Sequence, residues 1–493
     1  MNKIKSIFKQ GRVYFLGTQA AQAITLVAAI LSRRFLGPTQ MGIWSTLQVL
    51  VDYSKYSTAG LLDATAREIP YQIGKSNPVK ADEVKNLAFS FVAATSSVIV
   101  ISIFVFAFLM RGRFQNEVTY GLCLVGGVIF LQRFNNLLIG LLRAFKQFHV
   151  EAHMMVASAV VNALLVGTLS YYFKIYGFIW AMIFSFTFNI AYLLLAYKFR
   201  LRWYFDWKTL KPLLQYGFPL LILGVLAAVL KSLDRILIAK YLGFEKLGMY
   251  SIALMTCSYM GNFSIAIGIV LIPHFQEKFG LRDNPADLKI ALIKSTKVFA
   301  LGMPPLIYGA WLFTPYFVHW FLPQYSSGIT AMRILVLNMF FMALTQPYQD
   351  SLITIKKHLT LIPFLAGAIL IAAGLEYGVI RLGYDIQGVA AATTSAFFLL
   401  YTAIFWLSAG HFMKIAEAIK TYTYTLVCFL YLAGVLWFSS TFLSGANTAE
   451  IRHLSIQIPG YVLFMLPYVF ALNRNFDLLK KNKQNGSATS TVA

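Results

Sequence analysis

The chain is dominated by a succession of apolar segments, each about 20 residues long, with only short polar stretches between them. Charged residues make up 12% of its 493 residues, whereas a soluble domain usually carries about 25%. So few charges cannot cover a surface that faces water, which argues against a soluble multidomain enzyme and against a disordered chain. The sequence therefore predicts an all-α integral membrane protein.

The apolar segments predict about fourteen transmembrane helices, of which the second, fourth and ninth are the least hydrophobic. We place them at residues 13–32, 42–62, 86–110, 118–142, 150–173, 176–197, 213–239, 248–272, 290–313, 329–349, 359–380, 386–409, 421–440 and 454–472.

The distribution of Lys and Arg predicts the orientation in the membrane. The formal net charge is +23, and 28 of the 42 Lys and Arg fall on the side of the two termini, against 10 on the opposite side. Because cytoplasmic loops carry the excess of positive charge, this bias places the N- and C-termini in the cytoplasm. We expect a multi-pass membrane protein whose charge excess implies no nucleic-acid partner.

An internal repeat relates the two halves of the chain at an offset of 206 residues. Residues 31–45 (LSRRFLGPTQMGIWS) and 237–251 (LIAKYLGFEKLGMYS) are identical at five of fifteen positions. The repeat predicts two pseudo-symmetric six-helix lobes related by an axis along the membrane normal, with a central cleft between them. We assign residues 1–205 to the first lobe, 206–410 to the second, 411–475 to two additional helices, and 476–493 to a disordered cytoplasmic tail.

Charged residues within spans are candidate functional residues, because a charge in the membrane needs a partner or a water-filled cavity. In the seventh span Lys231, Asp234 and Arg235 share one helical face with small residues. Lys231 and Asp234 can pair at i, i+3, which leaves Arg235 as an excess cation. In the second span Asp52 and Lys55 have the same spacing. Both arrangements fit either a self-neutralised structural pair or the wall of a cationic cavity.

Four further residues are weighed in the same way. Arg133 is a cavity candidate in the fourth span, and Arg33 lies at the edge of the first span on the less basic side. Glu376 could bind a proton or a cation, whereas Asp350 is expected at the surface. Cations outnumber carboxylates in the first seven spans, and this balance suits a phosphate or pyrophosphate group better than an organic cation.

Signatures of soluble enzymes are missing from the sequence. The only GK[ST] is at residues 74–76 and lacks the leading glycine of a P-loop. His149 and His153 stand at i, i+4 without the HExxH pattern, so an ordinary helix start is a better interpretation than a metal site. The cytoplasmic loops are too short for a catalytic domain. We therefore expect a protein that is not an enzyme and needs no cofactor or metal.

Several short motifs together resemble the polysaccharide (O-antigen, Wzx-type) flippases of the MATE-like MOP superfamily. They are RRFLGP at 33–38, GIWS at 42–45, YGFP at 216–219, DRILI at 234–238, LG at 242–243 and GMYS at 248–251. The layout of six, six and two helices matches as well. The resemblance implies export of undecaprenyl-pyrophosphate-linked oligosaccharide, an O-antigen or other surface polysaccharide repeat unit, across the bacterial plasma (inner) membrane by alternating access.

The resemblance also assigns roles to the charged residues. The substrate-binding candidates of the cationic cavity are Arg33, Lys55, Arg133, Lys231 and Arg235. Asp52, Asp234 and Glu376 are candidates for counter-ions or for coupling to an H⁺ or Na⁺ gradient. Expected partners are the lipid-linked oligosaccharide, membrane lipids, a polysaccharide polymerase and a chain-length regulator. A MATE-type multidrug or cation antiporter and a flippase for the peptidoglycan lipid precursor remain alternatives.

Overall fold

The computed structural model describes residues 2–109, 116–197, 199–262, 288–355, 357–443 and 451–476. Within these ranges the elements are helices joined by short turns, and no strand occurs. The tail predicted to be disordered and the second part of the predicted eighth span lie outside the described residues. The chain divides by its contacts into two compact units, Met1–Ala239 with Gly243–Gly248, and Lys240–Leu242 with Met249–Ala493.

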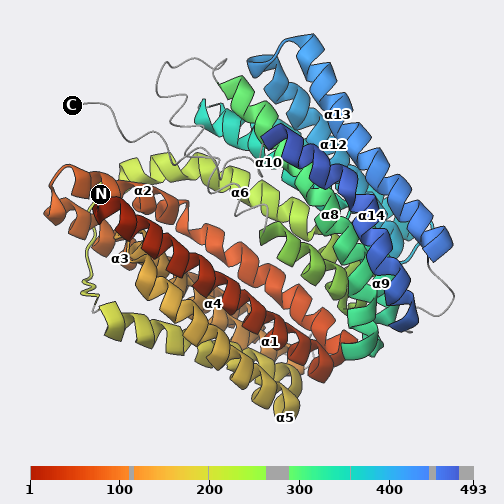
Figure 1. The fold of residues 1–493 in the computed structure, drawn as a ribbon. Coiled ribbons are helices and arrows are strands. Elements are labelled where there is room, and N and C mark those ends of the chain that lie inside the picture. The colour runs from red at the N-terminus through yellow and green to blue at the C-terminus, as the bar shows by residue number, and fades with distance from the viewer. Residues whose placement is uncertain are drawn as a thin grey trace, which may run out of the picture. The chain divides into compact units, whose positions relative to one another are not determined.

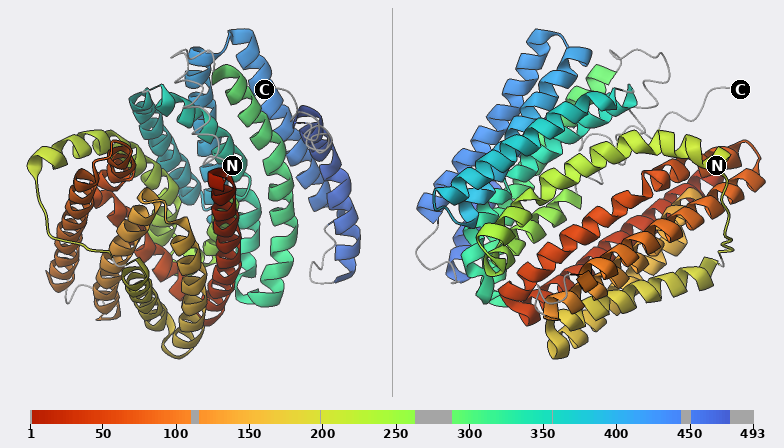
Figure 2. Two further views of the ribbon diagram at one scale, coloured as in Figure 1. Left: turned by 60° about the vertical axis from the view of Figure 1, so that its left-hand side comes forward. Right: turned by 180° about the vertical axis from the view of Figure 1, so that it is seen from behind.

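The first unit is a bundle of long helices. Helices α1, α4 and α5 contact one another, as do α3 and α4, and Figures 1 and 2 show α1, α4 and α5 side by side. Its elements are α1 (Asn2–Ser54), η1 (Lys55–Thr58), α2 (Leu61–Gly74), α3 (Pro78–Leu109), α4 (Asn116–Ala144), α5 (Phe148–Tyr197) and most of α6 (Trp207–Tyr241).

The second unit is built around α8, α10 and α12, whose facing sides are rich in buried aromatic residues. Tyr348 and Tyr401 are fully buried there, and Phe405 packs against both. Its elements are α8 (Lys289–Phe321), η3 (Pro323–Gly328), α9 (Ile329–Leu335), α10 (Asn338–Thr354), η4 (His358–Thr360), α11 (Leu361–Arg381), α12 (Ile386–Phe412), α13 (Ile415–Phe438), η5 (Ser439–Leu443) and α14 (Ile451–Phe476).

The contact boundary of the first unit falls one helix later than the boundary that the repeat predicts. Helix α6 begins at Trp207 and was assigned from the sequence to the second six-helix copy, yet it makes its contacts with the first unit up to Ala239. Contacts and internal symmetry are different properties, so the assignment of residues 1–205 and 206–410 to two symmetric copies stays a prediction.

Two of the long helices each contain two of the predicted spans. Helix α1 has 53 residues, and at 1.5 Å per residue a straight helix of that length would reach about 80 Å, more than twice the hydrocarbon thickness. Its backbone breaks at Gly37, where φ is 72°. Helix α5 has 50 residues and breaks at Lys174, where φ is 52°. Each break separates the members of a predicted pair of spans.

The long apolar helices confirm the all-α membrane fold. In the described ranges nine helices are long and apolar enough to cross a membrane, or ten if the bent pair Pro323–Leu335 and Asn338–Thr354 forms one span. Ten is below the predicted fourteen because α1 and α5 each hold two spans and because residues 457–472 of α14 form a shorter apolar stretch. The remaining predicted span, 248–272, lies partly outside the described residues.

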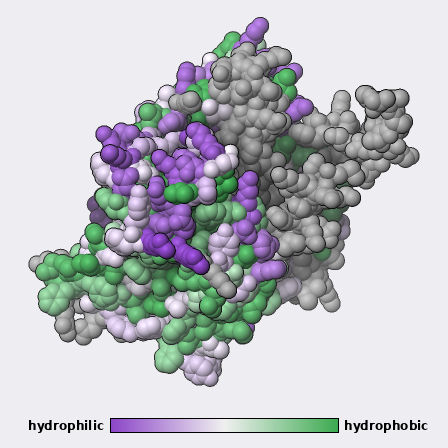
Figure 3. Space-filling model, turned by 90° about the vertical axis from the view of Figure 1, so that its left-hand side faces the viewer, coloured by the Kyte–Doolittle hydropathy of each residue, from purple (hydrophilic) through white to green (hydrophobic). Residues whose placement is uncertain are grey.

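Apolar side chains are exposed along these helices, as expected of a surface that faces lipid. Phe108 of α3 is 72% exposed, and Leu195 of α5 is 77% exposed. Contiguous apolar surface of this kind is rare in a soluble protein. On the face drawn in Figure 3, hydrophilic residues gather in one area, and hydrophobic residues cover the surface beside it.

Two glycines at equivalent repeat positions make a reciprocal close contact inside the first unit. A Cβ atom on Gly42 would lie 1.7 Å from the carbonyl oxygen of Phe244, and one on Gly248 would lie 1.7 Å from that of Pro38. Both pairs are related by the same 206-residue offset, so the contact has the reciprocity of an isologous pair. Gly37 and Gly243, also equivalent in the repeat, both have positive φ. The identical glycines of the repeat therefore serve the turns and this close approach.

We predict that Gly42→Ala and Gly248→Ala each lower the thermal stability of the detergent-solubilised protein. The added methyl group meets backbone that no side-chain rotation can clear, and such overpacking typically costs about 1–3 kcal/mol. The measurement is the melting midpoint, with size-exclusion chromatography as the readout of the folded fraction. Gly140→Ala is the matched control, because nothing lies within 4 Å of a Cβ at that helical position. Equal midpoints for all three variants would contradict the reciprocal contact.

Candidate functional site

Close backbone contacts seat α6 against the end of α1. A Cβ on Gly217 of α6 would lie 2.5 Å from the carbonyl oxygen of Gly60, so only glycine fits this crossing. Further along α6, a Cβ on Gly224 would lie 2.7 Å from the ring of Tyr56. At the penultimate residue of α1, Tyr53, the hydroxyl group lies 2.6 Å from that of Ser232. The two segments therefore lie in contact from residue 217 to residue 232 of α6.

A cavity of about 170 Å³ lies between these segments. It brings together polar and charged side chains from the predicted second and seventh spans, with small residues of α6 between them. Its lining residues are Val49, Asp52, Tyr53, Lys55, Tyr56, Ala227, Ala228, Lys231, Ser232 and Arg235. The structure thus places Asp52, Lys55, Lys231 and Arg235, four of the predicted site residues, around one space. We call it the α1–α6 cavity.

The α1–α6 cavity carries an excess of positive charge. Arg235 forms an ion pair with Asp52, with 3.5 Å between Nη1 and Oδ2. Lys55 and Lys231 are exposed, and neither ammonium group forms an ion pair with any residue that the structure describes. The Lys55 ammonium lies 4.9 Å from the centre of the neighbouring Tyr56 ring. Three cations thus face one carboxylate, which favours an anionic ligand.

The ion pair decides between alternatives that the sequence left open. Self-neutralised pairs within each helix, Asp52 with Lys55 and Lys231 with Asp234, were one interpretation, whereas Asp52 pairs across helices with Arg235. The α-helix of α1 ends at Ser54, so Lys55 stands in the 3₁₀ turn that follows and not in the same α-helix as Asp52. Asp234 is 3% exposed, and its Oδ1 accepts a hydrogen bond from the backbone nitrogen of Arg235 at 2.7 Å.

Arg133 of α4 lies outside the α1–α6 cavity and is 3% exposed. Its guanidinium donates to the carbonyl oxygen of Ser54 and, from Nε at 2.7 Å, to Ser96 Oγ. A third donor, Nη2, reaches Thr95 Oγ1 at 3.4 Å. Arg133 therefore joins α3 and α4 to the last residue of α1, directly before Lys55. This geometry assigns it a positioning role for the cavity wall.

The remaining predicted residues also lie away from the α1–α6 cavity. Arg33 is half-buried and donates to the carbonyl oxygen of Ala29 in its own helix at 3.2 Å. Glu376 is fully buried in the second unit and accepts a hydrogen bond from Thr393 at 2.8 Å. Asp350, expected at the surface, is 5% exposed and accepts from Gln346 at 2.9 Å. The expectation for Asp350 was wrong because α8 and α12 both contact α10.

His149 and His153 are exposed at the start of α5. Glu151 between them is fully buried, and one of its oxygens accepts two hydrogen bonds from Arg143, at 2.7 and 2.9 Å. The described residues hold no group of three His, Cys, Asp or Glu side chains arranged for a metal ion.

Three polar lining residues were not predicted from the sequence, namely Tyr53, Tyr56 and Ser232. For Tyr56 the reason is that residues were grouped by α-helical periodicity, which fails where α1 changes to a 3₁₀ turn. Gly224 of α6 was a signal for the position of Tyr56, because the missing side chain of this glycine makes room for the Tyr56 ring. Arg333 of the second unit was also not predicted from the sequence. It lies inside the bent pair, and its Cζ is 4.2 Å from the centre of the Trp311 ring.

The contacts of Arg133 predict that Arg133→Lys destabilises the protein although it keeps the positive charge. A lysine cannot reach three acceptors from a planar fork, and loss of charged hydrogen bonds at a buried site costs about 1.5–3 kcal/mol each. The melting midpoint in detergent measures the effect. Lys55→Arg, an exchange at an exposed cation, should leave the midpoint unchanged. An unchanged midpoint for Arg133→Lys would contradict the positioning role.

The chain was compared with models of known protein families, and one of them matches it. The family model described as "Polysaccharide biosynthesis protein" matches residues 30–327, more than half of the chain. This range includes both sides of the α1–α6 cavity. A search of curated proteins gave no significant match.

Solved structures of membrane transporters have a similar fold. An inward-facing multidrug resistance MATE family transporter of the MOP superfamily aligns with a TM-score of 0.69 at 17% identity, covering 81% of this chain and 96% of that one. The lipid II flippase MurJ in an inward closed conformation aligns with a TM-score of 0.68 at 16% identity, covering 94% of this chain and 99% of that one. The chain therefore has the MOP-type transporter fold.

Proposed function

We propose, on the premise that the chain belongs to the polysaccharide biosynthesis protein family, that it flips a pyrophosphate-linked lipid oligosaccharide across the membrane. The substrate would be an undecaprenyl-pyrophosphate-linked repeat unit of O-antigen or another surface polysaccharide. Alternating access moves it across the bacterial plasma membrane. The family and the fold are those of membrane carriers, and the proposed activity transports the substrate without changing its covalent bonds.

The α1–α6 cavity supports this proposal more than any other observation. Lys55 and Lys231 present ammonium groups, and Arg235 presents a guanidinium, to a space that holds a single carboxylate. A pyrophosphate carries several acceptor oxygens that match charged donors arriving from two sides. The rings of Tyr53 and Tyr56 line the same space and offer surfaces against which a sugar or a lipid carbon can pack. An organic cation would meet net repulsion at this wall.

A flippase for the peptidoglycan lipid precursor is the second candidate function. The lipid II flippase structure covers 94% of this chain, whereas the MATE structure covers 81%. The multidrug alternative is less favoured because of this coverage and because of the sign of the cavity charge. The coverage of the lipid II flippase keeps the precursor as a competing lipid substrate that an experiment must separate.

We predict that Lys231→Ala and Arg235→Ala reduce export of the surface polysaccharide at least roughly tenfold, since each removes a charged partner of the pyrophosphate. The measurement is surface polysaccharide in a strain whose own gene is replaced by the variant, normalised to protein in the membrane fraction. Lys231→Arg keeps the charge and should retain export. Lys211→Ala is the matched control, because Lys211 is an exposed cation of α6 that does not line the cavity.

Separate assays distinguish the competing substrates. Normal export in both alanine variants would contradict the cationic binding site. Growth rescue of a strain that lacks its peptidoglycan precursor flippase would favour the second candidate. Increased tolerance to organic cations that depends on the chain, with polysaccharide unaffected by its loss, would favour the multidrug antiporter.

The proposal includes a topology and a driving force. The N- and C-termini lie in the cytoplasm, in agreement with the distribution of Lys and Arg. Asp52 is the first candidate for coupling to H⁺ or Na⁺, since its carboxylate neutralises Arg235 and its protonation would release that cation toward the substrate. Asp234 and Glu376 are buried alternatives. A polysaccharide polymerase and a chain-length regulator remain the proposed protein partners.

A further inference from the structure

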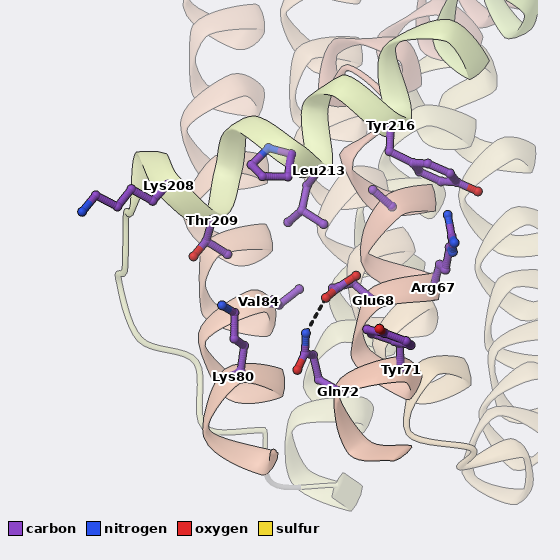
Figure 4. A pocket seen from close by; sticks show the side chains of 12 residues that line it. Arg67, Glu68, Tyr71, Gln72, Lys80, Val84, Lys208, Thr209, Leu213 and Tyr216 are labelled. Atoms are coloured by element: carbon purple, nitrogen blue, oxygen red, sulfur yellow. Dashed lines mark hydrogen bonds between the residues drawn. The ribbon is translucent and has the colours of Figure 1, made fainter. Parts of the chain in front are cut away.

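A second cavity, of about 420 Å³, lies in the first unit between α2, the start of α3 and the start of α6. It shares no lining residue with the α1–α6 cavity. Its charged lining residues are Arg67, Glu68, Lys80 and Lys208, all exposed or half-buried. They belong to segments that the charge bias places on the cytoplasmic side. We call this space the α2–α6 cavity; Figure 4 shows it.

The cations of the α2–α6 cavity come from three helices. In Figure 4, Arg67 of α2 and Lys80 of α3 stand on different sides of the space, whereas Lys208 of α6 extends away from the other groups at the rim. Arg67 stacks on the Tyr216 ring, with 4.6 Å from its Cζ to the ring centre. A guanidinium whose face rests on a ring keeps the donors of its edge available for an anion.

Glu68 is the one carboxylate of the lining, and it is already engaged. Its Oε1 accepts a hydrogen bond from Gln72 Nε2 at 2.6 Å, drawn as the dashed line in Figure 4. Asp206, just before α6, does not line the cavity; it caps that helix through the backbone nitrogens of Lys208 and Thr209. Hydrogen bonds from Thr209 hold the pKa of Asp206 below its ordinary value. The lining therefore carries three cations and one carboxylate.

The start of α3 adds to the positive potential. Lys80 lies in its first turn, which contains no acidic residue, whereas Asp206 caps the start of α6. A helix N-terminus is itself a positive pole, so a cation there is electrostatically unfavourable until an anion binds. Because the chain places Lys80 and Arg67 beside one cavity, an anionic ligand would relieve this repulsion.

We propose that the α2–α6 cavity binds the phosphate-bearing head group of an anionic phospholipid from the cytoplasmic leaflet. The cavity is larger than a bare phosphate needs, and Val84, Pro212 and Leu213 add apolar surface for glycerol and acyl carbons. Basic pockets between helices on the cytoplasmic side are suited to anionic lipid head groups. This inference does not depend on the proposed transport substrate, because the site is separate from the α1–α6 cavity.

The test measures lipid binding to the full-length protein in detergent. We expect phosphatidylglycerol to bind and to raise the melting midpoint, and phosphatidylcholine with the same acyl chains to do so much less, as read by native mass spectrometry and thermal shift. The double variant Arg67→Gln and Lys80→Gln should bind phosphatidylglycerol at least roughly tenfold more weakly. The matched control is Arg200→Gln with Lys211→Gln, which removes two exposed cations that do not line the cavity.

A variant that is expected to bind the lipid more tightly excludes misfolding as the explanation of weaker binding. Glu68→Gln removes the carboxylate and keeps a partner for Gln72, so it should bind phosphatidylglycerol more tightly than the unaltered protein. Equal binding of the two lipids, or undiminished binding by the double variant, would overturn the proposal. Free inorganic pyrophosphate tests the source of the anion. If pyrophosphate raises the midpoint through Arg67 and Lys80 and phosphatidylglycerol does not, the site takes a soluble anion and the lipid assignment is wrong.

Discussion

The crossing of α6 over the segment between α1 and α2 is the constraint on which the rest of the site depends. Gly60 and Gly217 meet backbone to backbone, at a distance that excludes any Cβ atom. This approach brings α6 near enough for Ser232 to reach the Tyr53 hydroxyl and for Arg235 to reach Asp52. Without it, the charges of the two segments would lie in lipid or would each need water of their own. The position of two glycines thus determines which charges share a cavity.

The local structure of α1 matters as much as this crossing. The last residue of its α-helix, Ser54, is followed directly by a 3₁₀ turn, and its carbonyl oxygen accepts a hydrogen bond from Arg133. Broken backbone at membrane depth is tolerated only where side chains or neighbouring helices replace the lost hydrogen bonds. A buried arginine that is costly in the membrane therefore stabilises the turn that presents Lys55.

The sequence predicted the fold and the main charged residues, but not their pairing. Segment hydropathy is a local property, and so the spans and the all-α membrane fold could be predicted without any tertiary information. The exact partners could not, because Asp52 and Arg235 are 183 residues apart in sequence and meet only through a close contact of glycines. Tyr56 was missed for a related reason, since helical periodicity does not extend past Ser54. Arg133 was placed correctly inside a span, but its three acceptors come from tertiary contacts.

The two cavities of the first unit follow one electrostatic principle at different places. A cation without a carboxylate partner is costly near the membrane interior, by about 2.5–3.5 kcal/mol at the centre of a span. Selection for stability alone would replace Lys55 and Lys231 or supply each with an acid, as Arg235 is supplied by Asp52. Their unpaired ammonium groups are understandable if the missing negative charge arrives with a ligand. Arg67 and Lys80 differ, because they are exposed on the predicted cytoplasmic side; there the excess of positive charge left by the engaged Glu68 attracts an anion without requiring one. The α1–α6 cavity must also release its anion, because a carrier that neutralised its substrate too well would hold it. Asp52 meets this need, since it competes with the substrate for Arg235 and keeps the binding energy moderate.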